Sequence, residues 1–308
     1  MVKTAFLYPG QGSQVAGMGI SVAERYPEAV SVFERASELA GYDVRSLCSE
    51  GPMEKLSQTR YTQPSLFTVE AAITDVLKAR DVHPECAAGH SLGEFGAWYT
   101  AGVYSFEDGF RLVSERGRIM DSVDPGGMGT MCAVIGLSGD VVEQTCQSVD
   151  GTVVVANINS PVQMVISGER EAVETAGNIL KEKGAKRIIP LKVSGAFHSP
   201  LMENAREEFE GVVENITVSD ARIPVYANVT AAPVTDADEI REVMVQQLTL
   251  PVRWIDIIKT MVNDGVSDAF EVGPGSVLAG LVKRINGSLD VSSMSDSSDI
   301  MEVLLGKN

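Results

Sequence analysis

Residues 87–93 read Ala-Ala-Gly-His-Ser-Leu-Gly, and this stretch decides how the rest of the chain is interpreted. Small and apolar residues precede Gly89, and a segment with helical character follows Gly93. In a nucleophile elbow, two glycines permit a sharp turn from a strand into a helix, and the serine between them is exposed at the helix N-terminus. The stretch therefore predicts a strand, a turn and a helix, with Ser91 as a candidate nucleophile. An ordinary glycine-rich turn is the alternative.

Strand and helix signals alternate on both sides of this turn. A short apolar strand is predicted at 4–8, followed by a glycine-rich loop at 9–19 and helices to about residue 80. A further strand is predicted at 268–272, and the Ser/Asp-rich segment 292–299 is expected to be mobile. Alternation of this kind is typical of α/β proteins with a mostly parallel sheet. We therefore predict a larger domain that resembles the α/β-hydrolases.

The region 128–193 has a different element order. Its pattern predicts, in sequence, a strand at 132–137, a helix at 139–148, strands at 152–156 and 163–167, a helix at 169–183 and a strand at 185–193. The order β-α-β-β-α-β is the split arrangement of ferredoxin-like domains. Turn-forming residues at 124–127 and 194–195 flank the region. We predict an inserted ferredoxin-like domain at 127–194 within a larger catalytic domain formed by 1–126 and 195–308.

The composition excludes several classes of partner. The 308 residues carry a net charge of −17, which opposes binding to a phosphate backbone unless basic residues gather on one face, and the sequence shows no such stripe. No apolar run has the length and flanks of a signal peptide or of a membrane-spanning helix. The four cysteines lie far apart, without metal-ligand spacing. We expect a cytoplasmic monomer that binds neither nucleic acid nor membrane and has no metal site.

A serine hydroxyl is a weak nucleophile until a base removes its proton, and histidine is the usual base. Of the three histidines, His90 is next to Ser91, so its side chain should leave the turn in another direction, and His83 lies in a surface connection. His198 lies in a loop where the chain re-enters the larger domain. By elimination, His198 is the predicted base. The main-chain amide of Leu92, next to Ser91, is placed to bind an oxyanion.

A helix predicted to begin near Ser105 has one charged residue on its apolar face. At 100° per residue, Arg116 falls in the middle of the sector that also contains Leu112, Val113, Ile119, Met120 and Val123. An arginine cannot lose its proton, and an unpaired buried charge costs several kcal/mol, so an anion must meet it. Either a protein carboxylate does so permanently, or a carboxylate or phosphate of the substrate does so on binding. The helix pattern favours neither.

Two glutamines are further candidates. Gln247 lies on the apolar stripe of a helix predicted at 236–249, where its side chain needs partners and its backbone carbonyl, near the helix end, is placed to orient a histidine. Gln11 lies in the loop after the first strand, which fits neither a dinucleotide-binding loop nor a P-loop. Because that loop and the Ser91 turn both follow strand C-termini, Gln11 is placed to supply a second oxyanion donor.

The chain resembles the malonyl-CoA:acyl-carrier-protein transacylases of bacterial fatty-acid synthesis and the acyltransferase domains of polyketide synthases. The matching strings occur in the expected order over nearly the whole length. They are Phe-Leu-Tyr-Pro-Gly-Gln-Gly-Ser-Gln (6–14), Thr-Gln-Pro-Ser-Leu (62–66), Gly-His-Ser-Leu-Gly-Glu-Phe (89–95), Glu-Arg-Gly-Arg-Ile-Met (115–120), Gly-Ala-Phe-His-Ser-Pro-Leu-Met (195–202), Gln-Leu-Thr-Leu-Pro-Val-Arg-Trp (247–254) and Glu-Val-Gly-Pro-Gly (271–275).

The resemblance implies a role for each candidate. Ser91 would be acylated, with His198 as its base, and the main-chain carbonyl of Gln247 would orient His198. The amides of Gln11 and Leu92 would form the oxyanion hole, and Arg116 would bind the malonyl carboxylate. The implied substrate is malonyl-CoA, the implied partner is an acyl carrier protein, and no cofactor is implied. Gly-Ala-Phe-His (195–198) is similar to the motif of malonyl-selecting polyketide acyltransferases, so a polyketide pathway is the alternative to fatty-acid synthesis.

Two other functions are compatible with part of this pattern. A serine esterase or thioesterase would share the elbow, but it would normally place an acid between the serine and a late histidine, and it has no use for a buried arginine. A non-catalytic module that binds a carrier protein would leave Ser91, His198 and Arg116 without a common function.

Carrier proteins are typically acidic, so we expect docking near a basic group in the insertion: Lys181, Lys183, Lys186, Arg187 and Lys192. A solvated helix end is the alternative for that group.

Overall fold

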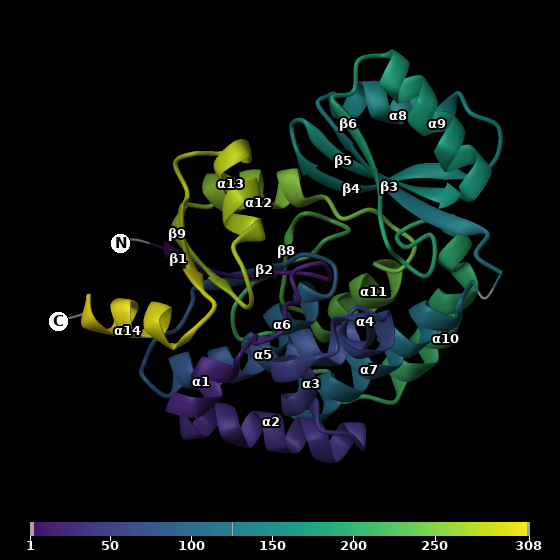
Figure 1. Ribbon diagram of the computed structural model, residues 1–308. Helices are drawn as coiled ribbons and strands as arrows, with labels where there is room; N and C mark the ends of the chain where they lie inside the picture. Colours follow the sequence, from purple (N-terminus) through teal and green to yellow (C-terminus); the bar gives the residue numbers. More distant parts are fainter. Residues whose placement is uncertain (1–2, 125, 307–308) are drawn as a thin grey trace.

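The computed structural model describes residues 3–124 and 126–306, and these form two sheets with helices packed around them (Figure 1). Pro125, in the first predicted crossing between the domains, lies outside the described residues. The larger sheet has six strands, in the order β10 (Asp290–Met294), β9 (Val266–Val272), β1 (Lys3–Tyr8), β2 (Cys86–Gly89), β7 (Val225–Tyr226) and β8 (Pro233–Val234). All neighbours pair in parallel except β7 and β8. This sheet confirms the predicted α/β class.

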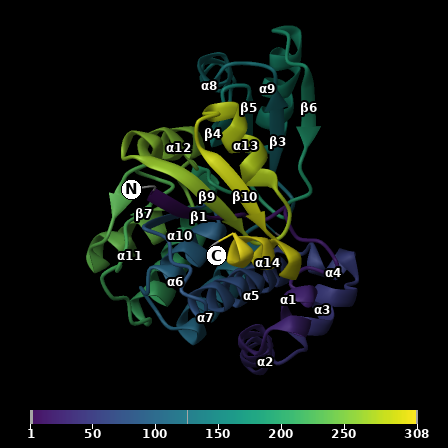
Figure 2. The same cartoon turned by 90° about the vertical axis from the view of Figure 1, so that its left-hand side faces the viewer.

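Helices cover both faces of the larger sheet, which explains why residues 5–8 of β1 and all of β2 are buried and lack charged side chains. In β1, Phe6 and Tyr8 pack into one core and Ala5 and Leu7 into another. The first core includes α5 (Thr59–Lys78), α6 (Gly93–Thr100) and α7 (Phe106–Ser122), and the second includes α12 (Trp254–Asn263) and α13 (Val277–Ile285). Both views place α12 and α13 on the side of the insertion and α5 on the opposite side (Figures 1 and 2).

The remaining helices outside residues 129–190 contribute residues to the first core. They are α1 (Ile20–Arg25), α2 (Pro27–Ala40), α3 (Val44–Glu50), α4 (Met53–Leu56), α10 (Glu203–Glu214), α11 (Ala237–Gln246) and α14 (Ser297–Leu305), with a short 3-10 turn at Pro200–Met202. Ser105 caps α7 as predicted, since its hydroxyl accepts a hydrogen bond from the Asp108 amide at 3.1 Å. In the described part of the chain, no helix combines the length and the apolarity that crossing a bilayer would require.

The second sheet is antiparallel and comes from residues within the predicted insertion. Its order is β4 (Val153–Ser160), β5 (Gln163–Glu169), β3 (Gly129–Ile135) and β6 (Arg187–Pro190), and α8 (Gly139–Gln147) and α9 (Arg170–Glu182) pack on it. The chain order is therefore β-α-β-β-α-β. The domain boundaries at 126/127 and 194/195 stay a prediction.

Two expectations for individual elements are wrong. The strand predicted at 185–193 covers only Arg187–Pro190, at the edge of the sheet, because among the described residues only the Leu191 amide, which donates to the Met131 carbonyl at 3.0 Å, still bonds to β3 after Pro190. The segment 292–299, expected to be mobile, belongs to β10 and to the start of α14. Its serine and aspartate side chains form the helix cap there: Asp296 accepts from the amides of Ser298 and Asp299, and Asp299 in turn accepts from the Asp296 amide.

Main-chain bonds join the two parts of the chain. Val252, which precedes α12, donates its amide to the Ala156 carbonyl at 2.9 Å and accepts from the Ile158 amide at 2.9 Å, so it forms a parallel bridge opposite Asn157. Asn157 and Ala156 are buried. Strand β4 of the smaller sheet is thereby fixed to a segment of the larger domain that lies between α11 and α12. We call this junction the seam.

Candidate active site

Ser91 lies in the predicted turn between β2 and α6. Its φ is +53°, in the left-handed region that non-glycine residues rarely adopt. A Cβ on Gly89 would lie 2.0 Å from the Gly93 carbonyl oxygen, and a Cβ on Gly93 would lie 2.1 Å from the Tyr8 carbonyl oxygen. Both positions therefore require glycine. The close approach of the backbone presents Ser91 at the carboxyl end of β2.

The side chain of Asn228 holds this turn, and the sequence did not point to it. Its Oδ1 accepts from the Ser91 amide at 2.7 Å and its Nδ2 donates to the Gly89 carbonyl at 2.6 Å. The Asn228 amide donates to Glu94 Oε2 at 2.6 Å, and Trp98 Nε1 donates to the other oxygen of Glu94 at 3.3 Å. Glu94 is fully buried, and burial raises its pKa to about 7. The buried side chains of Asn228 and Glu94 thus hold the strained backbone of the turn in place.

Replacing Asn228 with alanine is expected to lower the free energy of unfolding by about 2–4 kcal/mol, because two buried backbone groups lose their partners. Acylation of Ser91 should also slow, since Ser91 is no longer held in its left-handed conformation. Denaturant unfolding and single-turnover labelling measure the two effects. Asn178→Ala, at an exposed position on α9, is the matched control. Equal stability of the two variants would contradict a bracing role.

Ser91 and His198 form a hydrogen-bonded pair. The Ser91 Oγ to His198 Nε2 distance is 2.8 Å, and His198 Nδ1 lies 2.7 Å from the Gln247 carbonyl and 3.2 Å from the Leu250 carbonyl. Carbonyls only accept hydrogen bonds, so Nδ1 holds the proton and Nε2 is free to accept that of Ser91. Burial and, to a smaller extent, the Arg116 cation lower the pKa of His198 to about 3. The imidazole is therefore neutral and oriented as a base.

Arg116 lies beside this pair with neutral partners only. It is 1% exposed, and its guanidinium donates to Gln63 Oε1 at 2.9 Å, to Gln247 Oε1 at 2.7 Å and to Ser91 Oγ at 3.3 Å. The Phe95 ring stacks beneath it at 5.3 Å. Burial lowers the pKa of Arg116 to about 10, so it stays charged at neutral pH. Within residues 3–124 and 126–306, no carboxylate lies at ion-pair distance, which favours the alternative of a substrate anion.

The loop after β1 lies against the elbow, as predicted. The His90 amide donates to the Tyr8 carbonyl at 2.9 Å, and Gln11 follows three residues later. Among the described residues, the main-chain amides of Gln11 and Leu92 donate no hydrogen bond. The Gln11 side chain donates to Thr59 Oγ1 at 3.1 Å instead. Both amides are thus free to bind an oxyanion next to Ser91.

His90 points away from Ser91, as expected, and connects the site to the insertion. Its Nε2 lies 2.7 Å from Oδ1 of Asn159 on β4, and its ring packs against Trp254 with centroids 5.6 Å apart. Burial lowers the pKa of His90. The neutral ring therefore joins the elbow to the smaller sheet just beside the seam.

The five cations proposed for docking are all exposed, and in the part of the chain that the structure describes none forms an ion pair. Lys183 Nζ donates to Thr145 Oγ1 at 2.9 Å. Arg187 is the first residue of β6, and Lys186 precedes it. After β6 the chain continues to Ser194, whose hydroxyl is 3.3 Å from that of Thr59 beside Gln11. The basic group thus lies along the segment that leads to the site.

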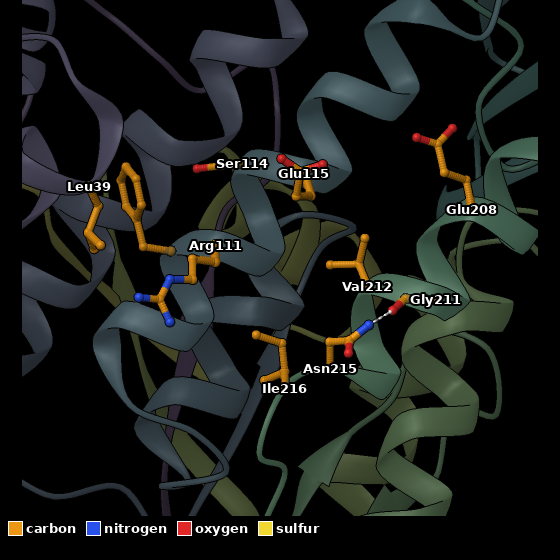
Figure 3. Close-up of a pocket in the computed structure, with 10 residues that line it drawn as sticks. Leu39, Arg111, Ser114, Glu115, Glu208, Gly211, Val212, Asn215 and Ile216 are labelled. Carbon is orange, nitrogen blue, oxygen red and sulfur yellow. Dashed lines mark hydrogen bonds between the residues drawn. The ribbon is translucent and has the colours of Figure 1, made fainter.

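A separate surface pocket of about 550 Å³ lies among α2, α7 and α10 (Figure 3). Leu39, Arg111, Glu208 and Ile216 are among its lining residues, and none of the candidate site residues lines it. The pocket therefore has no part in the site described above.

An elbow serine, a histidine held by a carbonyl and a buried arginine define a serine-dependent enzyme of acyl transfer. Comparison with known proteins agrees, because the model of the acyl transferase domain family matches residues 5–298. The malonyl CoA-acyl carrier protein transacylase of Bacillus subtilis is 42% identical over 303 residues, covering 97% of this chain and 96% of that protein. The chain belongs to the acyl transferase family, among the malonyl CoA-acyl carrier protein transacylases.

Solved structures agree in fold over the full length. An acyl carrier protein S-malonyltransferase from Vibrio cholerae superposes with a TM-score of 0.95 at 40% identity, covering 98% of this chain and 99% of that one. A malonyl-transacylase structure in complex with a type II PKS acyl-carrier protein gives a TM-score of 0.96 at 39% identity, with 99% of each chain covered. The predicted fold class and the family resemblance are confirmed.

Proposed function

We propose that this chain transfers a malonyl group from malonyl-CoA, through a malonyl-serine at Ser91, to the phosphopantetheine thiol of an acyl carrier protein. The observation that supports it most directly is the place of Arg116. A buried guanidinium with neutral protein partners lies 3.3 Å from the hydroxyl of a serine paired with histidine. A malonyl thioester has a carboxylate for the first group and an electrophilic carbonyl for the second.

In the first half-reaction, His198 Nε2 takes the proton of Ser91 as Oγ attacks the thioester carbonyl. The amides of Gln11 and Leu92 bind the resulting oxyanion, each contributing about 3 kcal/mol if typical. The protonated imidazole is stabilised by the Gln247 and Leu250 carbonyls at Nδ1. The tetrahedral intermediate then expels CoA, whose sulfur receives the proton from His198. The product is a malonyl ester of Ser91.

In the second half-reaction, the carrier-protein thiol replaces CoA. His198 takes the thiol proton, the thiolate attacks the malonyl ester, and Ser91 leaves with the proton returned by His198. The proposed cycle uses neither a metal nor a redox cofactor. We place the reaction in the cytoplasm and in fatty-acid synthesis, and a carrier protein from a polyketide pathway is the alternative acceptor. Transfer rates to the two kinds of carrier protein would distinguish these pathways.

Mass spectrometry of the intact protein tests the proposal. Malonyl-CoA alone should add one malonyl mass, and addition of a carrier protein should remove it and give malonyl-carrier protein. An esterase or thioesterase would instead release free malonate at the same rate with or without a thiol acceptor. A wild-type chain that never becomes malonylated would rule the proposal out.

Carrier-protein docking at the basic group gives a separate prediction. The double substitution of Lys186 and Arg187 by glutamate should slow malonyl transfer to the carrier protein by about tenfold at low salt, because charge complementarity governs encounter. Acylation by malonyl-CoA should change much less. The matched control is the same double substitution at Lys283 and Arg284, an adjacent exposed pair on α13. Equal losses in both half-reactions would count against docking at this place.

A further inference from the structure

We propose that Gln63 is a positioning residue that sets the preference for dicarboxylic acyl groups by holding Arg116 with a neutral amide. This inference rests on the proposed function, because it concerns the anion that Arg116 receives. Among the described residues, the Gln63 side chain hydrogen-bonds to Met120 and Arg116 and forms no hydrogen bond with Ser91 or His198. It acts through Arg116 alone.

The packing of α5 against α7 fixes the two residues in contact. Gly117, next to Arg116, lets the helices approach closely, since a Cβ there would lie 2.9 Å from the Thr59 carbonyl oxygen. Gln63 is fully buried in this interface. Its Nε2 donates to the Met120 sulfur at 3.3 Å, which leaves Oε1 facing Arg116 Nη1 at 2.9 Å. The amide orientation is therefore determined by its surroundings.

The other contacts of Arg116 are also made by uncharged groups. The side-chain oxygen of Gln247 holds Nη2, and the Phe95 ring supports the plane of the guanidinium. A guanidinium has five N–H donors, of which three are used by Gln63, Gln247 and Ser91. Nε is buried without a partner in the described part of the chain. Arg116 is thus held in place while donors and its full charge remain for a ligand.

The charge matters because a carboxylate in the place of either amide would hold Arg116 equally well. It would also cancel the charge, and a malonyl carboxylate would have to displace it. The acid that acts on Arg116 through its charge is Glu94, but its oxygens are occupied by Asn228 and Trp98 and its pKa is raised to about 7 by burial. The neutral amides of Gln63 and Gln247 therefore position the Arg116 cation without neutralising its charge. The carboxylate of the substrate neutralises that charge on binding.

The test compares malonyl-CoA with acetyl-CoA, which has no carboxylate for Arg116. In Gln63→Glu, kcat/KM for malonyl-CoA should fall roughly 10- to 100-fold, the range of a lost charge-assisted bond, mainly through KM. The value for acetyl-CoA should stay within about threefold, because the Ser91–His198 pair is unchanged. Gln63→Met, which keeps the volume and removes the acceptor, should lower the malonyl-to-acetyl ratio less than Gln63→Glu does.

Gln58→Glu is the matched control, because it adds the same charge at the exposed N-cap position that precedes the same helix. It should keep the wild-type ratio. Thermal melting identifies variants that fail to fold, and the ratio is then taken from Gln63→Met. If every Gln63 variant loses malonyl and acetyl transfer in equal proportion, Gln63 has only a packing role and the inference is overturned. Failure of the proposed function would appear differently, as a wild-type protein that is not malonylated at all.

Discussion

Replacing Ser91 with alanine is expected to abolish the malonyl-enzyme and to reduce the transfer rate on the order of 10⁶-fold, as when other serine enzymes lose their nucleophile. The fold should be unaffected, because the Ser91 backbone, which Asn228 and the Gln247 side chain hold, is unchanged. Intact-mass spectrometry after incubation with malonyl-CoA measures the first effect. A coupled assay of CoA release measures the second.

Ser57→Ala is the control for Ser91→Ala, since Ser57 is exposed and outside the site. It should label fully. A malonyl mass that persists in Ser91→Ala would place the acyl group on another residue, and peptide mapping would then locate it. That result would overturn the assignment of the nucleophile while leaving the family membership intact.

Replacing His198 with alanine should have an effect of similar size, about 10⁴- to 10⁶-fold on acylation, because Ser91 loses the group that accepts its proton. His83→Ala, at an exposed histidine, is the matched control and should retain wild-type rates. Single-turnover acylation by malonyl-CoA measures both variants. Rates for His198→Ala within tenfold of wild type would contradict a role as the base.

The same histidine determines the pH dependence of the reaction. Burial, followed by the Arg116 charge, lowers the pKa of His198 from 6.5 to about 3, so its neutral form persists far into the acid range. The pH dependence of kcat/KM reports the pKa values of the free enzyme. Protonation of His198 should therefore not lower kcat/KM between about pH 8 and pH 5. An acid limb centred near pH 6.5 would contradict this expectation, because it would mean that the pKa of His198 lies at the ordinary value for histidine.

The candidate site residues could be selected from the sequence, because two broke a local rule and the third was left after elimination. Arg116 was a charge on an apolar helix face, Gln247 an amide on an apolar stripe, and His198 the histidine left after elimination. Hydrogen bonds of 2.7–2.8 Å now connect His198 with Ser91 and with the Gln247 carbonyl. The hydrogen bond that Arg116 Nη2 donates to Oε1 of Gln247 could not be predicted, because the helical wheel of one helix carries no information about the helices packed against it.

The supporting residues could not be predicted, because their roles depend on contacts between distant segments. Asn228 is 137 residues from Ser91 in the chain, and Asn159 is 69 residues from His90. Both are common polar residues in turn-rich or strand segments, with no local anomaly. Gln63 was present in a string shared with the family, but its role as a partner of Arg116 required the packing of α5 on α7. Sequence patterns thus selected the candidate site residues and missed the polar residues that hold them in place.

The fold was predictable where periodicity is strong. The β-α-β-β-α-β order in the insertion and the strands β1 and β9 follow the expected pattern, with ends shifted by a few residues. The strand β10 and helix α14 were missed, since serine and aspartate suggest loops unless their caps are known. The edge strand β6 was predicted too long, because apolar residues after Pro190 continue the pattern, while in the described part of the chain only the Leu191 amide still bonds to β3 there.

The seam also limits how this chain can be recombined. Val252 pairs with both Ala156 and Ile158, and Asn159 beside them bonds to the histidine next to the nucleophile. The segment 127–194 is therefore not expected to be exchangeable on its own. A chimera that takes only 127–194 from a relative would bring a foreign β4 against the native 250–254 segment and would disturb the elbow through His90. Crossover points that keep β4 and 250–254 from the same parent should preserve activity, and the two segments are expected to change together in evolution.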